Sequence, residues 1–282
     1  MSKLIWYIDS ADGDDGNDGI SPAKPLKTWS HLNPVAGESV LFKRGSIIRG
    51  VLETRGGDES APVTYGAYGE GPAPSFLGST AVGDPALWRE IRPSIWRCSQ
   101  LFDSEVCNII FDGGPTCGNL RWSIDELENS GEWFFSAIGI SCQSAPGIKP
   151  EQSAHQLYLC SPSNPGEAWS SIECALWGVR RLVRGKHHVV IEDLSFENSG
   201  VAGYQDVHPV DVTIRNCAFR FIGGGVWILE HRVRFGNAVE LWDGAQDVTV
   251  EGCLFDNIYD AGVTHQGGET RNIPERVFFR DN

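Results

Sequence analysis

The segments VDVTIRNCAF (residues 210–219) and QDVTVEGCLF (residues 246–255) share one spacing of apolar residues. Two further copies, HVVIEDLSF (188–196) and the shortened ERVFFRDN (275–282), align with them without gaps on the pattern V-x-[IVF]-x-x-[LCN]-x-F. Because successive side chains of a β-strand point to opposite faces, this alternation predicts strands with one apolar face. A one-residue skip, at RN in one copy and EG in another, predicts a corner that keeps the next apolar residue inside.

The copies recur at a spacing that is typical of a repeat protein. The valines at the first position of the pattern, residues 189, 212, 248 and 277, are 23, 36 and 29 residues apart. A unit of about 23 residues with short strands and Gly or Asn corners predicts a solenoid, in which each coil stacks on the previous one. Apolar side chains would fill a column inside, and polar side chains would cover the outside. The alternative is a β-sandwich whose strands are similar by coincidence.

The amino-terminal part carries a resemblance to a known superfamily. The sequence YIDSADGDDGNDGISPAKPLKTWSHLN, followed by GESVLFKRGSIIRG and PVTYGAYGEG, resembles the start of right-handed parallel β-helix proteins. These form the pectate-lyase-like superfamily of polysaccharide lyases, glycoside hydrolases and phage tailspikes. The resemblance implies a single all-β domain over residues 1–282, a right-handed parallel β-helix with an N-terminal cap at residues 1–40. It also implies a short helix, expected at Pro25–Leu32, that closes one end of the apolar column.

Residues 84–180 carry no obvious copy of the repeat. Strand-like pieces NIIFDGG, EWFFSAIGI and HQLYLCSP predict two or three longer coils, with polar loops at Ser123–Ser130 and Gln143–Ser153. Aromatic residues of such a region are more often core than sugar-binding. The tryptophans concerned are Trp88, Trp96, Trp122, Trp133, Trp169 and Trp177.

Composition limits the partners. A formal net charge of -14 argues against nucleic acid as a ligand, and it would repel a polyanionic sugar unless a basic patch or bound cation intervened. No apolar window of about 18 residues is present, so we expect no membrane span. The start MSKLIWYIDS lacks the features of a secretory signal. The location stays open, although the superfamily implies a secreted, periplasmic or phage-associated protein.

The cysteines and acidic residues do not define a metal site. Cys217 and Cys253 occupy matching apolar positions, so the eight cysteines are interpreted mainly as reduced core thiols. The stretch DGDDGNDG fails the calcium-loop pattern, because Gly16 stands at the second ligand position and Pro25 where the bidentate Glu belongs. It is interpreted as a cluster of turns. The sequence requires no cofactor, and Ca²⁺ would be expected only for a lyase.

The segment 236–268 combines strand-like pieces with acids and a histidine. If Val239 points inward, Glu240 points outward, and Asp260 and Asp243 fall at the two corners of neighbouring strands. We predict Glu240, Asp260 and Asp243 as the catalytic carboxylates. Replacing Glu240 by glutamine is then expected to abolish cleavage and leave the fold intact. The alternative is that these residues are solvated side chains on the wet face of a sheet.

Two further segments should wall a groove over this strand. One is the insertion 223–236, and the other is GYQDVHP at 203–209. His265 would face inward by strict alternation, which favours a buried histidine with its hydrogen bonds satisfied. The candidate substrate-binding residues are Tyr204, Asp206, His208, Trp227, His231, Arg232, Arg234, Trp242, Thr264 and His265.

Such a groove suits an extended polysaccharide or oligosaccharide. A glycoside hydrolase needs two carboxylates, whereas a polysaccharide lyase needs a base and a group that neutralises a uronate. Either enzyme fits the residues, and a non-catalytic sugar-binding or structural β-helix, or a truncated inactive relative, is the alternative. Because Val277 and Phe279 would end the column uncovered, we also expect either a shortened member of a longer family or a homo-oligomer formed through this end.

Overall fold

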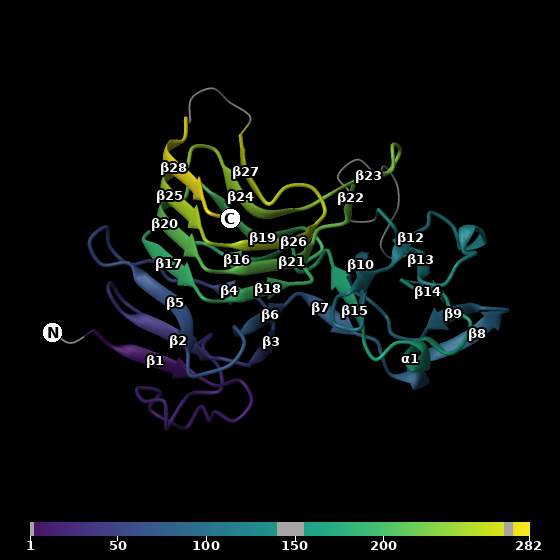
Figure 1. Cartoon of the computed structure of the whole chain (residues 1–282), viewed down its shortest axis with the longest axis horizontal. Helices are drawn as coiled ribbons and strands as arrows, with labels where there is room; N and C mark the ends of the chain where they lie inside the picture. Colours follow the sequence, from purple (N-terminus) through teal and green to yellow (C-terminus); the bar gives the residue numbers. More distant parts are fainter. Residues whose placement is uncertain (1–2, 140–154, 268–272) are drawn as a thin grey trace.

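The computed structural model describes residues 3–139, 155–267 and 273–282 (Figure 1). Nearly all of its regular structure is β-strand. Within the described ranges, three parallel sheets, called here sheets A, B and C, lie beside a group of mostly antiparallel strands. The polar loop predicted at Gln143–Ser153 falls outside the described residues.

Each parallel sheet collects strands from distant parts of the chain. Sheet A has the order β1 (Ile5–Ile8), β2 (Ser39–Lys43), β5 (Val63–Tyr68), β17 (Val189–Glu192), β20 (Val210–Arg215), β25 (Gln246–Glu251), β28 (Glu275–Arg280). Sheet B has the order β3 (Ile47–Arg49), β6 (Ser75–Leu77), β18 (Ser195–Glu197), β21 (Ala218–Ile222), β26 (Leu254–Ile258). Sheet C has the order β4 (Leu52–Glu53), β16 (Arg181–Arg184), β19 (Ala202–Val207), β24 (Asn237–Trp242), β27 (Val263–Gln266).

The chain visits these sheets in a repeating order. After β16 it runs through β17, β18 and β19, then through β20, β21 and β24, then through β25, β26 and β27, and returns to sheet A in β28. Val189 pairs with Val212, Val212 with Val248, and Val248 with Val277. These pairs confirm that the four sequence copies stack in one register, and the face-packed antiparallel layers of a sandwich are not found in this part of the chain.

A stack of phenylalanines fills the interior behind sheet B. Phe76, Phe196, Phe219 and Phe255 come from successive strands of the sheet, and the motif predicts the last three. Their ring centroids are 5.6, 5.3 and 5.5 Å apart in stacked orientation. Phe76, Phe196 and Phe219 are completely buried. Aromatic stacking in line with the strand register therefore joins successive strands of sheet B from the inside.

The corner after each repeat strand of sheet A uses one backbone conformation. Asp193, Asn216, Gly252 and Asp281 follow the strands β17, β20, β25 and β28, and their φ angles are 59, 52, 59 and 50°. This left-handed region is costly for most L-residues and is tolerated best by Gly, Asn and Asp. The skip that the sequence shows at RN and EG is therefore a left-handed corner residue.

We expect Asn216→Ala to lower the free energy of unfolding by about 1–2 kcal/mol, because alanine pays the full cost of the left-handed region. Asn216→Gly should lower it much less. Asn216 is exposed, so neither change alters the packing of the core. Urea unfolding of the three proteins checks this. Equal losses in both variants would show that the Asn216 side chain, and not the backbone, stabilises the corner.

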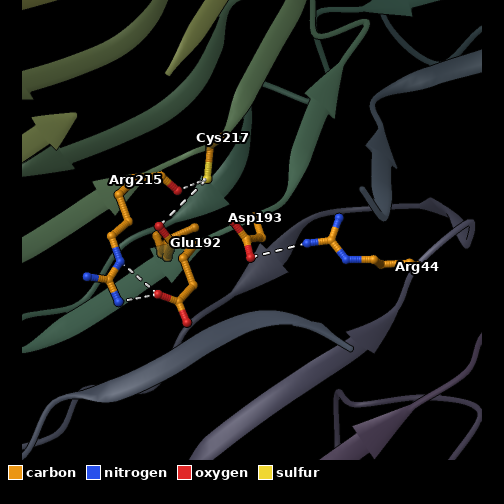
Figure 2. A network of polar contacts seen from close by, with 6 residues as sticks. Arg44, Glu192, Asp193, Arg215 and Cys217 are labelled. Carbon is orange, nitrogen blue, oxygen red and sulfur yellow. Dashed lines mark hydrogen bonds and ion pairs between the residues drawn. The ribbon is translucent and has the colours of Figure 1, made fainter. Parts of the chain in front are cut away.

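Ion pairs cross this corner between coils (Figure 2). Arg44, which follows β2, bonds Asp193 at 3.2 Å, and the Arg215 Nε bonds Glu192 at 2.8 Å. The Cys217 Sγ lies 3.6 Å from the Ile191 carbonyl oxygen, behind the charged groups. The pairs are partly exposed, so each contributes little stability on its own. Cys217 confirms the interpretation of a buried thiol, and the seven described cysteines are free.

Residues 78–180 interrupt the series between β6 and β16 and form an inserted unit, seen on the right of Figure 1. Its first sheet has the order β11 (Thr116–Cys117), β10 (Val106–Phe111), β15 (Ile172–Leu176), β7 (Ser79–Ala81). Its second has the order β12 (Asn119–Leu120), β13 (Glu132–Phe135), β14 (Leu157–Cys160), β9 (Ile95–Cys98), β8 (Trp88–Arg92). Short helical turns are η1 (Pro85–Leu87), η2 (Ile124–Glu126) and α1 (Pro165–Ala168).

The prediction that residues 84–180 form longer coils is wrong. Each of the three strand-like pieces contains strand residues, but most pairs in the unit are antiparallel. The unit has its own core, which includes the buried Trp88 and Trp133. Antiparallel neighbours that are close in sequence bury their apolar faces against each other, so this segment does not need the column. The polar loop predicted at Ser123–Ser130 is confirmed and contains η2.

The helix predicted at Pro25–Leu32 is absent from this described segment. The backbone of Leu26 instead bonds both Tyr7 and Asp9 beside β1, which holds it extended. The Asp15 carboxylate accepts bonds from the amides of Lys27 and Thr28. Leu26 and Leu32 are nevertheless buried in the core of the parallel sheets. The acidic stretch is a cluster of turns, as predicted, since Asp14 and Asp18 accept from amides two residues on.

At the other end of the stack, β28 is only partly covered. Val277 packs against the core, whereas Phe279, at the next inward position, is 46% exposed. No helix among the described residues is long and apolar enough to cross a bilayer.

Candidate functional site

A row of polar side chains crosses the outer face of sheet C. Strand register places Arg184 beside both Glu53 and Gln205, Gln205 beside Glu240, and Glu240 beside Thr264. Because side chains alternate along a strand, the residues that precede these in each strand point into the core. Neighbouring strands lie about 4.8 Å apart, so the row extends for about 19 Å. The predicted pairing of Glu240 with Thr264 is confirmed.

Glu240 lies between Gln205 and Thr264 in this row, and it is buried. Its side chain is 2% exposed. The carboxylate accepts hydrogen bonds from the Asn237 Nδ2 at 2.6 Å, the Trp242 Nε1 at 3.1 Å and the Gln266 Nε2 at 3.2 Å, and also from the Gln205 Nε2. For Glu240, the alternative of a solvated side chain on the wet face of a sheet is therefore wrong. A position on the outer face is not the same as exposure, because neighbouring side chains cover this one.

The four hydrogen bonds explain how the sheet holds an acid here. Burying a carboxylate without partners is very costly, whereas donors at both oxygens restore the lost hydration. Asn237 and Gln266 donate to Oε1, and Gln205 and Trp242 donate to Oε2. All four donors are uncharged side chains. The arrangement is a preorganised site for a carboxylate rather than an ion pair.

The other two predicted carboxylates lie at opposite ends of this strand pair. Asp260 is exposed, and its amide donates to the carbonyl of Gly236 before β24 begins. Asp243 is half-buried just after β24, and its amide donates to the carbonyl of Gln266. At about 3.3 Å per residue, the strand separates their backbones by about 20 Å. Each could therefore act only with Glu240, and not with the other.

The second predicted wall is not a loop. Residues 202–207 form β19, which pairs with β24 as part of sheet C itself. Tyr204 is completely buried in the core, and burial together with nearby Asp206 raises the pKa of its hydroxyl well above the usual value. Its ring is not available to a ligand. Asp206 is half-buried, and His208, after the strand, is exposed.

His265 is placed as alternation predicts. It pairs with the buried Leu241 and is half-buried. However, its Nε2 is enclosed without a hydrogen-bond partner among the described residues, so the predicted satisfied histidine is only half correct.

The insertion 223–236 forms a hairpin of β22 (Gly225–Ile228) and β23 (Val233–Phe235). Its arginines contact the inserted unit and Tyr259, which follows β26. The Arg234 Nη2 bonds the Cys107 carbonyl at 2.7 Å, and its guanidinium lies 4.7 Å from the Tyr259 ring centroid. Burial lowers the pKa of Arg234. Arg232 lies over the Trp122 ring at 5.4 Å.

The apolar residues of the hairpin continue the same contact. Phe235 packs edge-on against Trp177 and against Trp227, which is 40% exposed, and His231 at the tip is exposed. The hairpin thus joins sheet C to the inserted unit (Figure 1). These contacts do not support the prediction of a wall over Glu240.

Sequence reasoning missed two cavities beside the polar row. One, of about 340 Å³, is lined by Val51, Gly178, Arg180, Arg181, Arg184 and Gln205. The other, of about 370 Å³, shares Val51 and is lined mainly by Trp29, Leu32, Val40, Glu53, Arg55 and Tyr65. The available signal was GVRRLVRG at residues 178–185, a basic cluster in an acidic chain. In the sequence these arginines stand on both sides of the apolar pair Leu182 and Val183. They are therefore not distinguishable from the charged residues that commonly end a strand.

Metal ligands are not grouped in this region. Among residues 3–139, 155–267 and 273–282, no set of three or more His, Cys, Asp or Glu side chains is arranged to hold a metal ion.

Known proteins with the same fold act on carbohydrates. Over 77 residues the chain is 36% identical to lacto-N-biosidase of Bifidobacterium longum subsp. longum, covering 24% of this chain and 5% of that protein. The structure of GH136 lacto-N-biosidase from Eubacterium ramulus covers 98% of this chain at 15% identity and a TM-score of 0.51. A structure described as a glycoside hydrolase covers 93% at 11% identity and a TM-score of 0.59. No protein-family model matches the sequence.

These relatives are longer than the chain. It spans 40% of the Eubacterium ramulus enzyme and 67% of the second structure. At these identities the structural likeness shows a shared, mostly β fold.

Proposed function

We propose that this chain is a right-handed parallel β-helix that works as a carbohydrate-active glycoside hydrolase or as a module of one. The repeating order of sheets A, B and C and the in-register valines support the helix. Parallel crossover connections are right-handed in nearly all proteins, which supports the handedness. In this proposal residues 1–282 are one domain, residues 1–40 are its cap, and the inserted unit is an excursion from one coil.

The observation that carries the proposal is the polar row on sheet C that contains the buried Glu240. It offers amide, hydroxyl, guanidinium and carboxylate groups along about 19 Å, which suits the hydroxyl-rich edge of an oligosaccharide. The cavity next to it adds Trp29, a half-buried aromatic residue on which a sugar ring could stack. The similarity to lacto-N-biosidase and to glycoside hydrolases supports hydrolysis over the other reactions.

Hydrolysis requires a second carboxylate besides Glu240. Glycosidases use two carboxyl groups about 5–5.5 Å apart when they retain configuration and about 6.5–9.5 Å apart when they invert it. We propose Asp243 or Asp260 as the partner. Glu240 would become accessible when the substrate displaces the Trp242 or Gln266 side chain that covers it.

Single substitutions separate these assignments. Asp243→Asn and Asp260→Asn should both fold, because neither side chain is buried. We expect one of them to lose about 100-fold or more in turnover and the other to keep the wild-type rate, since a general acid or base contributes about 10²–10⁴-fold. The measurement is the release of reducing ends from a panel of neutral and acidic oligosaccharides, with absorbance of unsaturated uronates as the lyase readout. Wild-type turnover in both variants would remove the assignment.

One observation favours a second function, a sugar-binding module without catalysis. Glu240 is fully hydrogen-bonded and buried, which suits a residue that shapes a binding surface. Such a module would release no product in the same assay, but it would bind an oligosaccharide in an equilibrium binding measurement.

A further inference from the structure

The cavity lined by the three arginines concentrates positive charge on an acidic protein. Arg180, Arg181 and Arg184 line it, together with Gln205 from the neighbouring strand, and the cavity holds about 340 Å³. The chain as a whole has a formal net charge of -14. A cationic hollow on such a surface is a local exception, and it lies at one end of the polar row described above.

Much of this charge is not neutralised within the protein. The Arg184 Nη1 bonds Glu53 at 2.8 Å, and both side chains are more than half exposed. The Arg181 Nη1 bonds only a neutral oxygen, the Oε1 of Gln205, at 3.3 Å. Within the part of the chain that the structure describes, neither Arg180 nor Arg181 has a carboxylate within ion-pair distance. The cavity thus presents guanidinium groups that can still accept an anion.

The positive charges of the three arginines also repel one another. Burial lowers the pKa of Arg181, and Arg184 and Arg180 lower it further, whereas Asp206 and Glu53 offset part of the effect. Like charges held close together are stabilised by an anion placed between them. Asp206 and Glu53 are the two carboxylates that act on Arg181, and they do not balance the three guanidinium groups that line the cavity. The Glu240 carboxylate lies beyond Gln205 and is already bonded by four uncharged donors.

Gln205 connects this cavity to the buried acid. Its Oε1 accepts from Arg181 and its Nε2 donates to Glu240, so both ends of the amide are fixed by their partners. An anion bound to Arg181 would therefore lie one side chain away from the Glu240 carboxylate.

We propose that the Arg180–Arg181–Arg184 cavity binds the anionic group of an acidic saccharide, a carboxylate or a sulfate ester. Guanidinium groups bind such groups with paired, charge-assisted hydrogen bonds. This inference rests on the proposed function, because it assigns an acidic substrate class to the same face of sheet C. An acidic chain is expected to repel an anionic sugar. The arginines of the cavity supply the local basic patch that overcomes this repulsion.

Equilibrium binding to the full chain tests this. The probes are a uronate tetrasaccharide, a sulfated tetrasaccharide, the matching neutral tetrasaccharide and inorganic phosphate, each at low and high ionic strength. We expect an acidic tetrasaccharide to bind at least about tenfold more tightly than both the neutral one and phosphate, with affinity that falls as salt rises. Phosphate binding as tightly as either acidic tetrasaccharide would overturn the assignment to a saccharide.

The variants are Arg181→Gln and the more exposed Arg180→Gln, with Arg89→Gln in the inserted unit as a control for the same change in charge. We expect each cavity variant to lose about tenfold in affinity for the acidic probe and to keep its affinity for the neutral probe, while the control keeps both. Circular dichroism verifies that all three fold. Wild-type affinity in both cavity variants would overturn the inference.

The two proposals fail separately. Cleavage of neutral oligosaccharides with no arginine-dependent preference for acidic ones would leave the hydrolase standing and overturn this inference. Arginine-dependent binding of an acidic probe without cleavage would support this site while the hydrolase fails.

Discussion

Glu240→Gln is expected to lower the free energy of unfolding by about 1–3 kcal/mol, because it leaves buried donors without an acceptor. Each carboxylate oxygen accepts from two N–H groups. Replacing either oxygen by an amide NH₂ turns a pair of bonds into donors facing donors. Urea unfolding measures the loss. The sequence alone led us to expect that this substitution leaves the fold intact. From the hydrogen bonds around Glu240 we now expect that it also lowers the free energy of unfolding.

Trp242→Phe is the matched control for this prediction. It removes one donor to Oε2 and keeps both the carboxylate and an aromatic ring in place, so it should cost only about 1 kcal/mol. A Glu240→Gln protein as stable as wild type would show that the hydrogen bonds around Glu240 do not stabilise the sheet, and would return this residue to a purely functional role.

Phe196→Ala is expected to have the largest effect on stability, a loss of about 3–5 kcal/mol in the free energy of unfolding. Phe196 is completely buried and stacks on Phe76 and Phe219. Its removal leaves a cavity in the column and separates aromatic contacts on both sides. Urea or thermal unfolding measures the change.

Phe255→Ala provides the comparison within the same stack. Phe255 stacks on Phe219 but is only half-buried, so its loss should be clearly smaller. Equal losses at the two positions would contradict the view that burial within the column, rather than the sequence motif, sets the contribution of each ring.

The parallel sheets could be predicted because their signal is local and repeated. Val189, Val212, Val248 and Val277 occupy one position in four copies, and stacked copies must share a register. A slip by one residue would turn every apolar side chain outward, so the pattern fixes which residues pair. The left-handed corners at Asn216 and Gly252 follow from the same alignment, since both residue types tolerate that conformation.

The inserted unit could not be predicted in the same way. Most of its strands pair antiparallel within the unit, and no copy of the repeat marks where the parallel sheets are interrupted. Short apolar runs such as Leu157–Cys160 are equally consistent with a coil and with a sandwich strand. The pairing of Ser79–Ala81 with Ile172–Leu176 closes the base of the unit, and nothing in the sequence shows that contact.

For the candidate site, the sequence predicts which face of the sheet a side chain lies on, but not which neighbouring side chains contact it. Alternation predicts that Glu240 lies on the outer face beside Thr264, and the register confirms it. It cannot predict that Trp242 and Gln266 reach back over the carboxylate, since this depends on rotamers. The cavity at Arg181 and Arg184 was missed because Val51, far away in the chain, also lines it.

The inserted unit leaves the stack and returns to it at nearly the same point. A side chain at Gly78 would lie 3.1 Å from Val179, although about a hundred residues separate them, and β7 pairs with β15 just inside these ends. Closing so long a loop opposes the pairing of β4 with β16, because the entropy cost rises with the logarithm of its length. The pairing of β7 with β15 closes the inserted unit at its two ends. The free energy of the contacts within the unit therefore offsets the entropy cost of closing this loop. The parallel sheets can then form as if a short turn joined β6 to β16. An inserted unit of a different length or fold could replace this one without changing how the sheets pair.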